Sequence, residues 1–215
     1  MITHKQAVSH LRVMWAALFA AIFLVGVHTT ADAITIFNAT LTGSQETPPN
    51  SSTATGTATF ILNDAQTALS FTATIFGLDF TGSQTPASTA DNLVAAHIHC
   101  CAAPGAAASI VWGFFGSPFN DNNPNDNVFT PFGVGVGGTV SGKWDAPEGN
   151  STTLAEQLPS ILAGLSYINF HTTQFPGGEI RGQILKVPEP SAFILFGIGL
   201  LVLRMAASRR QKRLL

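Results

Sequence analysis

The chain has 215 residues, and its ten lysines and arginines against twelve aspartates and glutamates give a formal net charge of −2. Between residues 34 and 187, however, three cations stand against ten acidic residues, a formal charge of −7. Binding of nucleic acid depends on lysine and arginine contacts to phosphates, so this composition excludes a nucleic-acid partner.

The N-terminus has the pattern of a secretory signal peptide. Lys5, His10 and Arg12 form a basic region, 13–27 an apolar one, and Ala31-Asp32-Ala33 an A-x-A cleavage site. We predict a signal peptide over 1–33, with cleavage after Ala33. An uncleaved anchor is the alternative, but the apolar run is shorter than the ~20 residues of a spanning helix.

Alternation of small or polar with apolar residues dominates the body of the chain and predicts β-strands. Residues 53–62 and 69–75 alternate in this way, and the polar residues 63–66 between them predict a hairpin turn. Further strands are expected at 34–41, 95–99, 110–115, 139–144, 167–172 and 179–185. Eight short strands with small-residue turns indicate one all-β domain over 34–186, either a sandwich or a barrel. Of these we expect an antiparallel Greek-key sandwich, immunoglobulin-like or superoxide-dismutase-like. Its expected core includes Phe60, Leu69, Phe71, Ile75, Ile98, Ile168, Phe170, Ile180 and Ile184.

One helix and one long loop interrupt this pattern. Leu154, Leu158 and Ile161 recur at helical spacing after the candidate N-caps Thr152 and Thr153, although Pro159 should shorten or kink the helix. Residues 117–138 are expected to form a loop. Its Asp121, Asn123 and Asn125 have the spacing of calcium ligands, but glycine and glutamate are missing at the later positions of that motif, which favours ordinary turn chemistry.

The body contains three histidines. In Ala96-His97-Ile98-His99 the pleat places both imidazoles on one face of a strand, about 7 Å apart at Cα. His171 should join them if its strand pairs beside theirs with Phe170 turned inward. The three rings then form a candidate metal site opposite the core; hydrogen-bonded histidines beneath a loop are the alternative.

Three other groups of residues could carry chemistry or shape a turn. Cys100 and Cys101 follow His99 directly; a vicinal disulfide, two free thiols and a metal ligand are all open, and an oxidising compartment favours the disulfide. Arg181 shares a strand face with Glu179 and could pair with it. Glu46, which precedes two prolines, is interpreted as a turn anchor that accepts backbone N–H groups.

The C-terminal tail combines a turn, an apolar run and a cluster of cations. Pro188-Glu189-Pro190 ends the last strand, 192–203 is almost wholly apolar, and five arginines and lysines follow from Arg204 to Arg213. This tail over 187–215 resembles the PEP-CTERM sorting signal of Gram-negative envelope proteins. The resemblance implies export to the envelope, surface or matrix, passage through the inner membrane and recognition by an exosortase-type enzyme. A plain membrane anchor without processing, in which the tail is retained, is the alternative.

Three motifs of the body resemble those of the CHRD (chordin) domain. They are Phe37 to Pro49, Ala96 to His99, and Tyr167 to Thr172 with Gly178 to Gly182, in the order of that family. The resemblance implies an all-β extracellular module without an established enzymatic activity. A fainter similarity, to Cu/Zn superoxide dismutase, implies that His97, His99 and His171 are copper ligands and that Arg181 binds an anion. Because no histidine is left for a zinc bridge, only a mononuclear copper site fits.

Two functions follow from these observations. The first is a non-enzymatic surface module that binds an extracellular matrix polysaccharide or protein. The second is a mononuclear copper protein or a weak copper redox enzyme that uses the three histidines.

Overall fold

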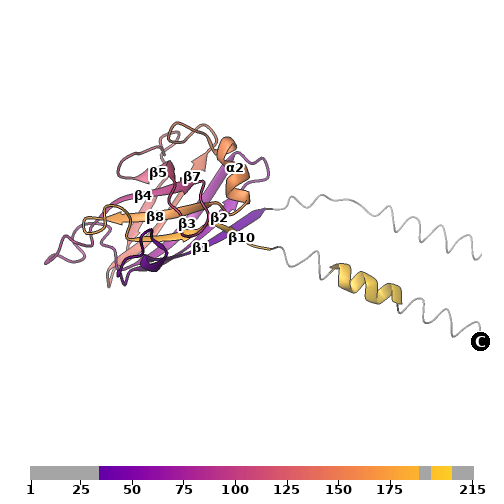
Figure 1. The fold of residues 1–215 in the computed structure, drawn as a ribbon, viewed down its shortest axis with the longest axis horizontal. Coiled ribbons are helices and arrows are strands. Elements are labelled where there is room, and N and C mark those ends of the chain that lie inside the picture. Colours follow the sequence, from indigo (N-terminus) through magenta and orange to yellow (C-terminus); the bar gives the residue numbers. More distant parts are fainter. Residues whose placement is uncertain (1–33, 189–194, 205–215) are drawn as a thin grey trace, which may run out of the picture. The chain divides into compact units, whose positions relative to one another are not determined.

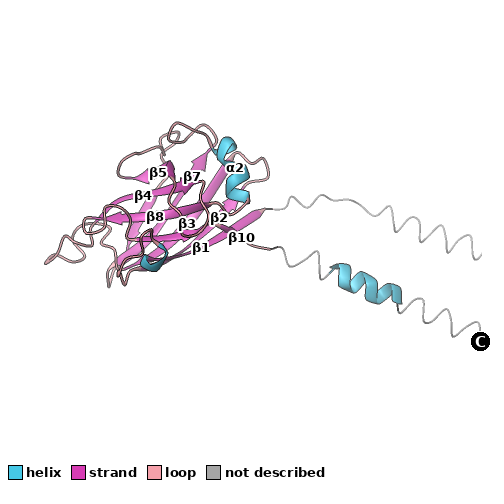
Figure 2. Cartoon of the chain, viewed as in Figure 1, coloured by secondary structure: helices cyan, strands magenta, loops and turns pink. Residues whose placement is uncertain are grey.

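The computed structural model describes residues 34–188 and 195–204, which Figure 1 shows in colour. The first of these ranges contains ten strands and two short helical segments. Figure 2 colours the strands magenta and the helices cyan. The helical segments are η1 (Gly43–Gln45) and α2 (Leu154–Leu162). The strands are β1 (Thr35–Thr42), β2 (Thr55–Leu62), β3 (Ala68–Phe76), β4 (Leu93–Cys100), β5 (Ser109–Phe115), β6 (Val128–Pro131), β7 (Gly137–Asp145), β8 (Ser166–Thr172), β9 (Ile180–Gln183) and β10 (Leu185–Lys186).

The strands pair antiparallel in the order β5-β4-β8-β9-β1-β2-β3-β7-β6, and β10 also pairs with β1. Aromatic contacts show that the two halves of this sheet face each other. Phe71 of β3 lies 4.8 Å from Phe114 of β5, and Trp144 of β7 stacks on Trp112 of β5 at 5.8 Å between ring centroids. The sheet is therefore folded over into a two-layer sandwich, which confirms the predicted all-β antiparallel fold.

Period-two alternation has the expected consequence in burial. On β2 the exposed residues alternate strictly with buried ones, and on β3 Leu69, Phe71, Ala73 and Ile75 are all buried. All nine residues expected in the core are at most 3% exposed. Because every buried member of the core lies between Phe37 and Ile184, this segment has a core of its own and is expected to fold without the flanking segments.

Two strand predictions differ from the structure. β6 lies within the expected loop 117–138; it is a short edge strand whose residues are mostly exposed, so it carries no alternation of apolar residues. The expected strand 179–185 is divided into β9 and β10, because β9 pairs with both β8 and β1, whereas β10 pairs with β1 alone. The first difference arises because β6 lacks the alternation that marks a strand. The second arises because β10 has only one of the two neighbouring strands of β9.

Helix α2 begins where the sequence predicts. Thr153 is its N-cap and forms a capping box with Glu156, which satisfies backbone N–H groups at the start of the helix. Pro159 lies inside the helix, which still continues to Leu162.

Residues 195–204 of the tail are also helical. Within the described ranges, no helix is long and apolar enough to cross a membrane. The predicted signal peptide, Glu189 and Pro190 lie outside these ranges, so the targeting helices and any membrane span remain predictions.

Candidate metal centre

The three histidines come from the neighbouring strands β4 and β8. His171 pairs with Ala95, and Asn169, two residues earlier, pairs with His97, so all three imidazoles lie on the same face of the sheet. Ile98 and Phe170 point the other way and are 1% and 0% exposed. The pleat and the register therefore bring together the histidines that the sequence singled out.

The imidazole rings form a compact cluster. Ring centroids are 4.9 Å apart for His97 and His171, 5.8 Å for His97 and His99, and 6.1 Å for His99 and His171. One nitrogen from each ring lies within 4.8 Å of the other two. The shortest separation is 3.2 Å, between Nδ1 of His97 and Nε2 of His171.

One nitrogen of each ring is hydrogen-bonded to a backbone carbonyl. Nε2 of His97 bonds to Ser117 at 3.2 Å, Nδ1 of His99 to Ala108 at 2.9 Å, and Nδ1 of His171 to Pro176 at 3.0 Å. A carbonyl oxygen only accepts, so these three nitrogens carry the protons of the neutral rings. The other three nitrogens are left with lone pairs, and that of His99, Nε2, has no partner among the described residues.

Burial keeps these rings neutral. It lowers the pKa of His97 to about 3, helped by the neighbouring His171 and His99. Burial likewise lowers the pKa of His99 to about 4 and that of His171 in the same direction. At neutral pH two lone pairs thus face each other across 3.2 Å with both ring protons directed elsewhere. A cation between them would relieve this repulsion.

Loops cover the cluster from outside, although it lies on the outer face of the sheet. The three histidines are only 2–7% exposed. The carbonyl acceptors belong to the 101–108 loop, the turn after β5 and the loop after β8. Gly113, opposite His97, has no room for a side chain, because a Cβ there would lie 1.9 Å from the carbonyl oxygen of Pro118. The glycine therefore lets the covering turn approach the site.

Tyr167 separates the histidines from Arg181. Its ring stacks on His99 at 4.7 Å with an interplanar angle of 6°, and the guanidinium of Arg181 lies 4.5 Å from its centroid. His99 is on β4, Tyr167 on β8 and Arg181 on β9, and β8 lies between the other two strands. The ring of Tyr167 therefore lies between His99 and Arg181. The structure thus places Arg181 near the site but not among its imidazoles.

Arg181 bonds to loops and not to Glu179. Its guanidinium donates to the carbonyl of Gln45, to Oγ1 of Thr47 and to the carbonyl of Ala106. The carboxylate of Glu179 instead accepts from the hydroxyls of Ser52 and Thr172. Arg181 therefore does not pair with Glu179, the alternative that the sequence left open, because hydroxyl donors occupy that carboxylate.

Glu46 has the backbone hydrogen bond expected of a turn anchor, with Thr47, but it is also deeply buried. Its side chain is 6% exposed, and Oε1 has no hydrogen-bond partner among the described residues. Burial raises the pKa of this carboxyl to about 7, although the positive charge of Arg181 lowers it. Sequence reasoning missed this group because nothing in Gln45-Glu46-Thr47-Pro48 shows that loops will bury it.

The two cysteines and the three residues with the spacing of calcium ligands lie outside the histidine cluster. Cys100 and Cys101 are bonded to each other at the end of β4. Asp121 is fully buried, whereas Asn123 and Asn125 are exposed. Glu148 organises that loop by accepting the backbone N–H groups of Asn122 and Asn123, which is turn chemistry.

Two models of known protein families match parts of this chain. The model of the CHRD domain matches residues 37–184, and that of the PEP-CTERM protein-sorting motif matches residues 186–211. The sorting motif indicates export to the cell surface in Gram-negative bacteria and an exosortase as the enzyme that recognises it. Searches of curated proteins and of solved structures each found no match. Since the first match covers most of the chain, this protein belongs to the CHRD domain family.

Proposed function

We propose that this exported CHRD-domain protein is a non-enzymatic surface module that holds one copper ion at His97, His99 and His171. The observation that carries the proposal is the convergence of three imidazole nitrogens whose ring protons all point to backbone carbonyls. Metal-binding histidines commonly direct their second nitrogen to such an acceptor, which fixes the ring and its tautomer.

The distances are compatible with a single ion. At a metal–nitrogen distance of about 2.1 Å, a 3.2 Å spacing between two nitrogens corresponds to an angle of about 100° at the metal. Two ligands of one ion lie at most about 4.2 Å apart, so the widest spacing of 4.8 Å requires one ring to move inward. Binding of an ion therefore requires a small movement of one side chain, but no change in the pairing of β4 with β8.

The donor set favours copper. The cluster contains imidazoles alone, and both cysteines are bonded to each other. Neutral imidazole suits copper, zinc, iron and nickel, and the affinity of such sites is highest for Cu²⁺ in the divalent series. We expect copper to bind more tightly than zinc.

Because the three histidines are buried, the site is better suited to storing a metal ion than to using it in catalysis. A catalytic metal needs an open position for its substrate, whereas these histidines are 2–7% exposed beneath three loops. A surface module of this kind would serve the envelope by binding the ion and, through its exposed faces, a matrix polysaccharide or protein.

The test is metal retention by residues 34–187. The segment is stripped with a chelator, loaded with Cu²⁺ or Zn²⁺, dialysed and measured by elemental analysis. We expect one copper per chain, and at least a tenfold weaker affinity after His97→Gln or His171→Gln. Asn38→Ala, an exposed change on β1, serves as the control and should retain the metal.

Two outcomes would contradict the proposal. One is wild-type protein that keeps no copper after dialysis. The other is a His97→Gln, His99→Gln, His171→Gln triple variant that remains folded and keeps as much copper as the wild type.

A further inference from the structure

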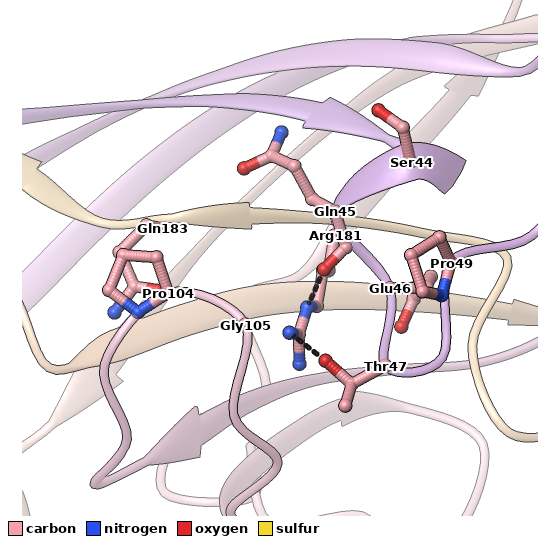
Figure 3. A pocket seen from close by; sticks show the side chains of 9 residues that line it. All are labelled: Ser44, Gln45, Glu46, Thr47, Pro49, Pro104, Gly105, Arg181 and Gln183. Carbon is pink, nitrogen blue, oxygen red and sulfur yellow. Dashed lines mark hydrogen bonds between the residues drawn. The ribbon is translucent and has the colours of Figure 1, made fainter.

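A pocket on the other side of Tyr167 is independent of the histidines. It has a volume of about 350 Å³ and is bordered by Ser44, Glu46, Thr47, Pro49, Pro104 and Arg181, among others (Figure 3). Residues 43–49 after β1 form one wall and the 101–108 loop forms another, with Arg181 of β9 between them.

Arg181 is a buried cation without an ion pair. Its side chain is 4% exposed, and no carboxylate of the described residues lies within 4.0 Å of it; the ion pairs found there are those of Lys143. Buried charges are normally paired, because their removal from water is costly. The hydrogen-bond partners of this guanidinium are two carbonyls and one hydroxyl, and its other neighbour is the ring of Tyr167, so no carboxylate of the described residues bonds to it directly.

The guanidinium also retains hydrogen-bonding capacity. It has five N–H groups, and its three bonds use Nε and one N–H on each terminal nitrogen. One N–H remains on Nη1 and one on Nη2. Two such donors are what a carboxylate accepts from arginine in a bidentate pair.

We propose that this pocket binds the carboxylate of a small organic acid, with Arg181 as the cationic partner and Glu46 as the group that controls the affinity. Glu46 borders the same pocket, and its Oε1 is buried without a partner. When Glu46 is ionised it repels a second carboxylate. When it is protonated it is neutral and can donate a hydrogen bond.

Few other groups around Glu46 titrate near neutral pH. A guanidinium is a permanent cation in proteins. The histidines beyond Tyr167 stay neutral because burial lowers their pKa values. Glu179 is held by the hydroxyls of Ser52 and Thr172. Burial raises the pKa of Glu46 to about 7, so a change between pH 6 and pH 8 acts chiefly on this carboxyl.

A free acid fits this pocket better than an acidic polymer. The body between residues 34 and 187 has ten acidic residues and three lysines or arginines. This negative charge repels a polyanion as it approaches. A monomer carries a single charge that Arg181 can neutralise.

The experiment uses ¹⁵N-labelled residues 34–187 without added metal, so its outcome is separate from that of the copper proposal. Arg181 is the only arginine in this segment, and its Nε–H signal is therefore unique. Sodium acetate and sodium glucuronate are titrated against sodium chloride of equal ionic strength, with the neutral ester methyl acetate as the control. Both acids should shift the Arg181 signal, and the ester should not.

The pH dependence tests the role of Glu46. If binding requires protonated Glu46, the apparent affinity for acetate falls about tenfold from pH 6 to pH 8. Glu46→Gln should abolish this fall and bind acetate more tightly than the wild type at pH 8, a gain that misfolding cannot produce. Asp64→Asn removes one exposed charge elsewhere and should keep the wild-type profile.

The proposal is overturned if neither acid shifts the Arg181 signal, if methyl acetate shifts it equally, or if Glu46→Gln gives no gain at pH 8. A larger response to alginate than to glucuronate, compared per carboxylate, would overturn the assignment to a small acid, because the ligand would then be a polymer.

Discussion

The three histidines of the cluster are buried, and one nitrogen of each ring has a lone pair without a proton. Protonating any of its rings places a charge beneath loops that offer carbonyls to only one nitrogen per ring. The unfolded chain has no such constraint, so its histidines titrate near their ordinary pKa of about 6.5. The folded protein therefore takes up protons at these residues only at lower pH than the unfolded chain.

This difference predicts acid sensitivity of the metal-free protein. The pKa values of His97 and His99 are lowered to about 3 and about 4, and that of His171 is also lowered. Stability from these groups is complete above pH 6.5 and declines as pH falls, because the unfolded state then binds more protons. We expect a loss on the order of 1 kcal/mol per histidine between pH 7 and pH 5.

Urea unfolding of wild type and of the triple histidine-to-glutamine variant at both pH values measures this loss. Glu46 and Asp121, whose pKa values are raised to about 7 and about 6, act in the opposite direction. They are present in both proteins and cancel in the comparison. An equal loss in the two proteins would show that the histidines do not cause it.

The sequence predicts part of this site. The pleat alone places His97 and His99 on one face, because their spacing is two residues. The position of His171 depends on the pairing of β8 with β4, which no local pattern of residues specifies. The burial of Glu46 and the separation of Arg181 from the imidazoles by Tyr167 depend on loops that meet only in the folded protein. These were therefore beyond sequence reasoning.

At the scale of elements, strands with one buried face were predictable and those without one were not. β2 and β3 alternate strictly, and both were found within two residues of their ends. β6 has no such alternation and was missed. The order of strands in the sheet likewise depends on pairings between strands that are distant in the sequence, which the composition of single strands does not specify.

Phe71 on β3 gives a test of the folded-over sheet. It contacts Phe60 in its own layer and both Trp112 and Phe114 in the opposite layer. Phe71→Ala should lower the free energy of unfolding by ~3 to 5 kcal/mol, since it leaves a cavity between the layers. Phe76→Ala, on the same strand but 54% exposed, is the matched control and should cost much less. Similar losses in urea unfolding for the two variants would contradict the sandwich.

At the scale of the whole molecule, the two ends of the domain lie together. Phe37 near the start of β1 pairs with Lys186 at the end of β10, and the N–H of Val187 donates to the carbonyl of Ile36. The sorting motif at residues 186–211 therefore begins where the last strand ends. Removal of the predicted leader and of the tail is expected to leave the core intact, because its members among the described residues lie between Phe37 and Ile184.

Processing at both ends is accordingly expected in a host with the sorting enzyme. The surface-released protein should begin at Ile34 and lack the segment from Ala192 to Leu215. Intact-mass measurement decides this, and Pro188→Ala with Pro190→Ala should reduce the release. A released form whose mass includes the terminal arginines would rule out the removal of the tail.

The central claim, that the three histidines hold one copper ion, has a direct reporter in Tyr167. It is the only tyrosine of the chain, and its ring lies 4.7 Å from that of His99. Incorporating 3-fluorotyrosine gives a single ¹⁹F signal, which a paramagnetic Cu²⁺ ion at the cluster would broaden beyond detection. We predict that this signal disappears at one equivalent of Cu²⁺, returns on chelation and persists in the triple histidine variant. A signal that stays sharp in the wild type beyond one equivalent would contradict this claim.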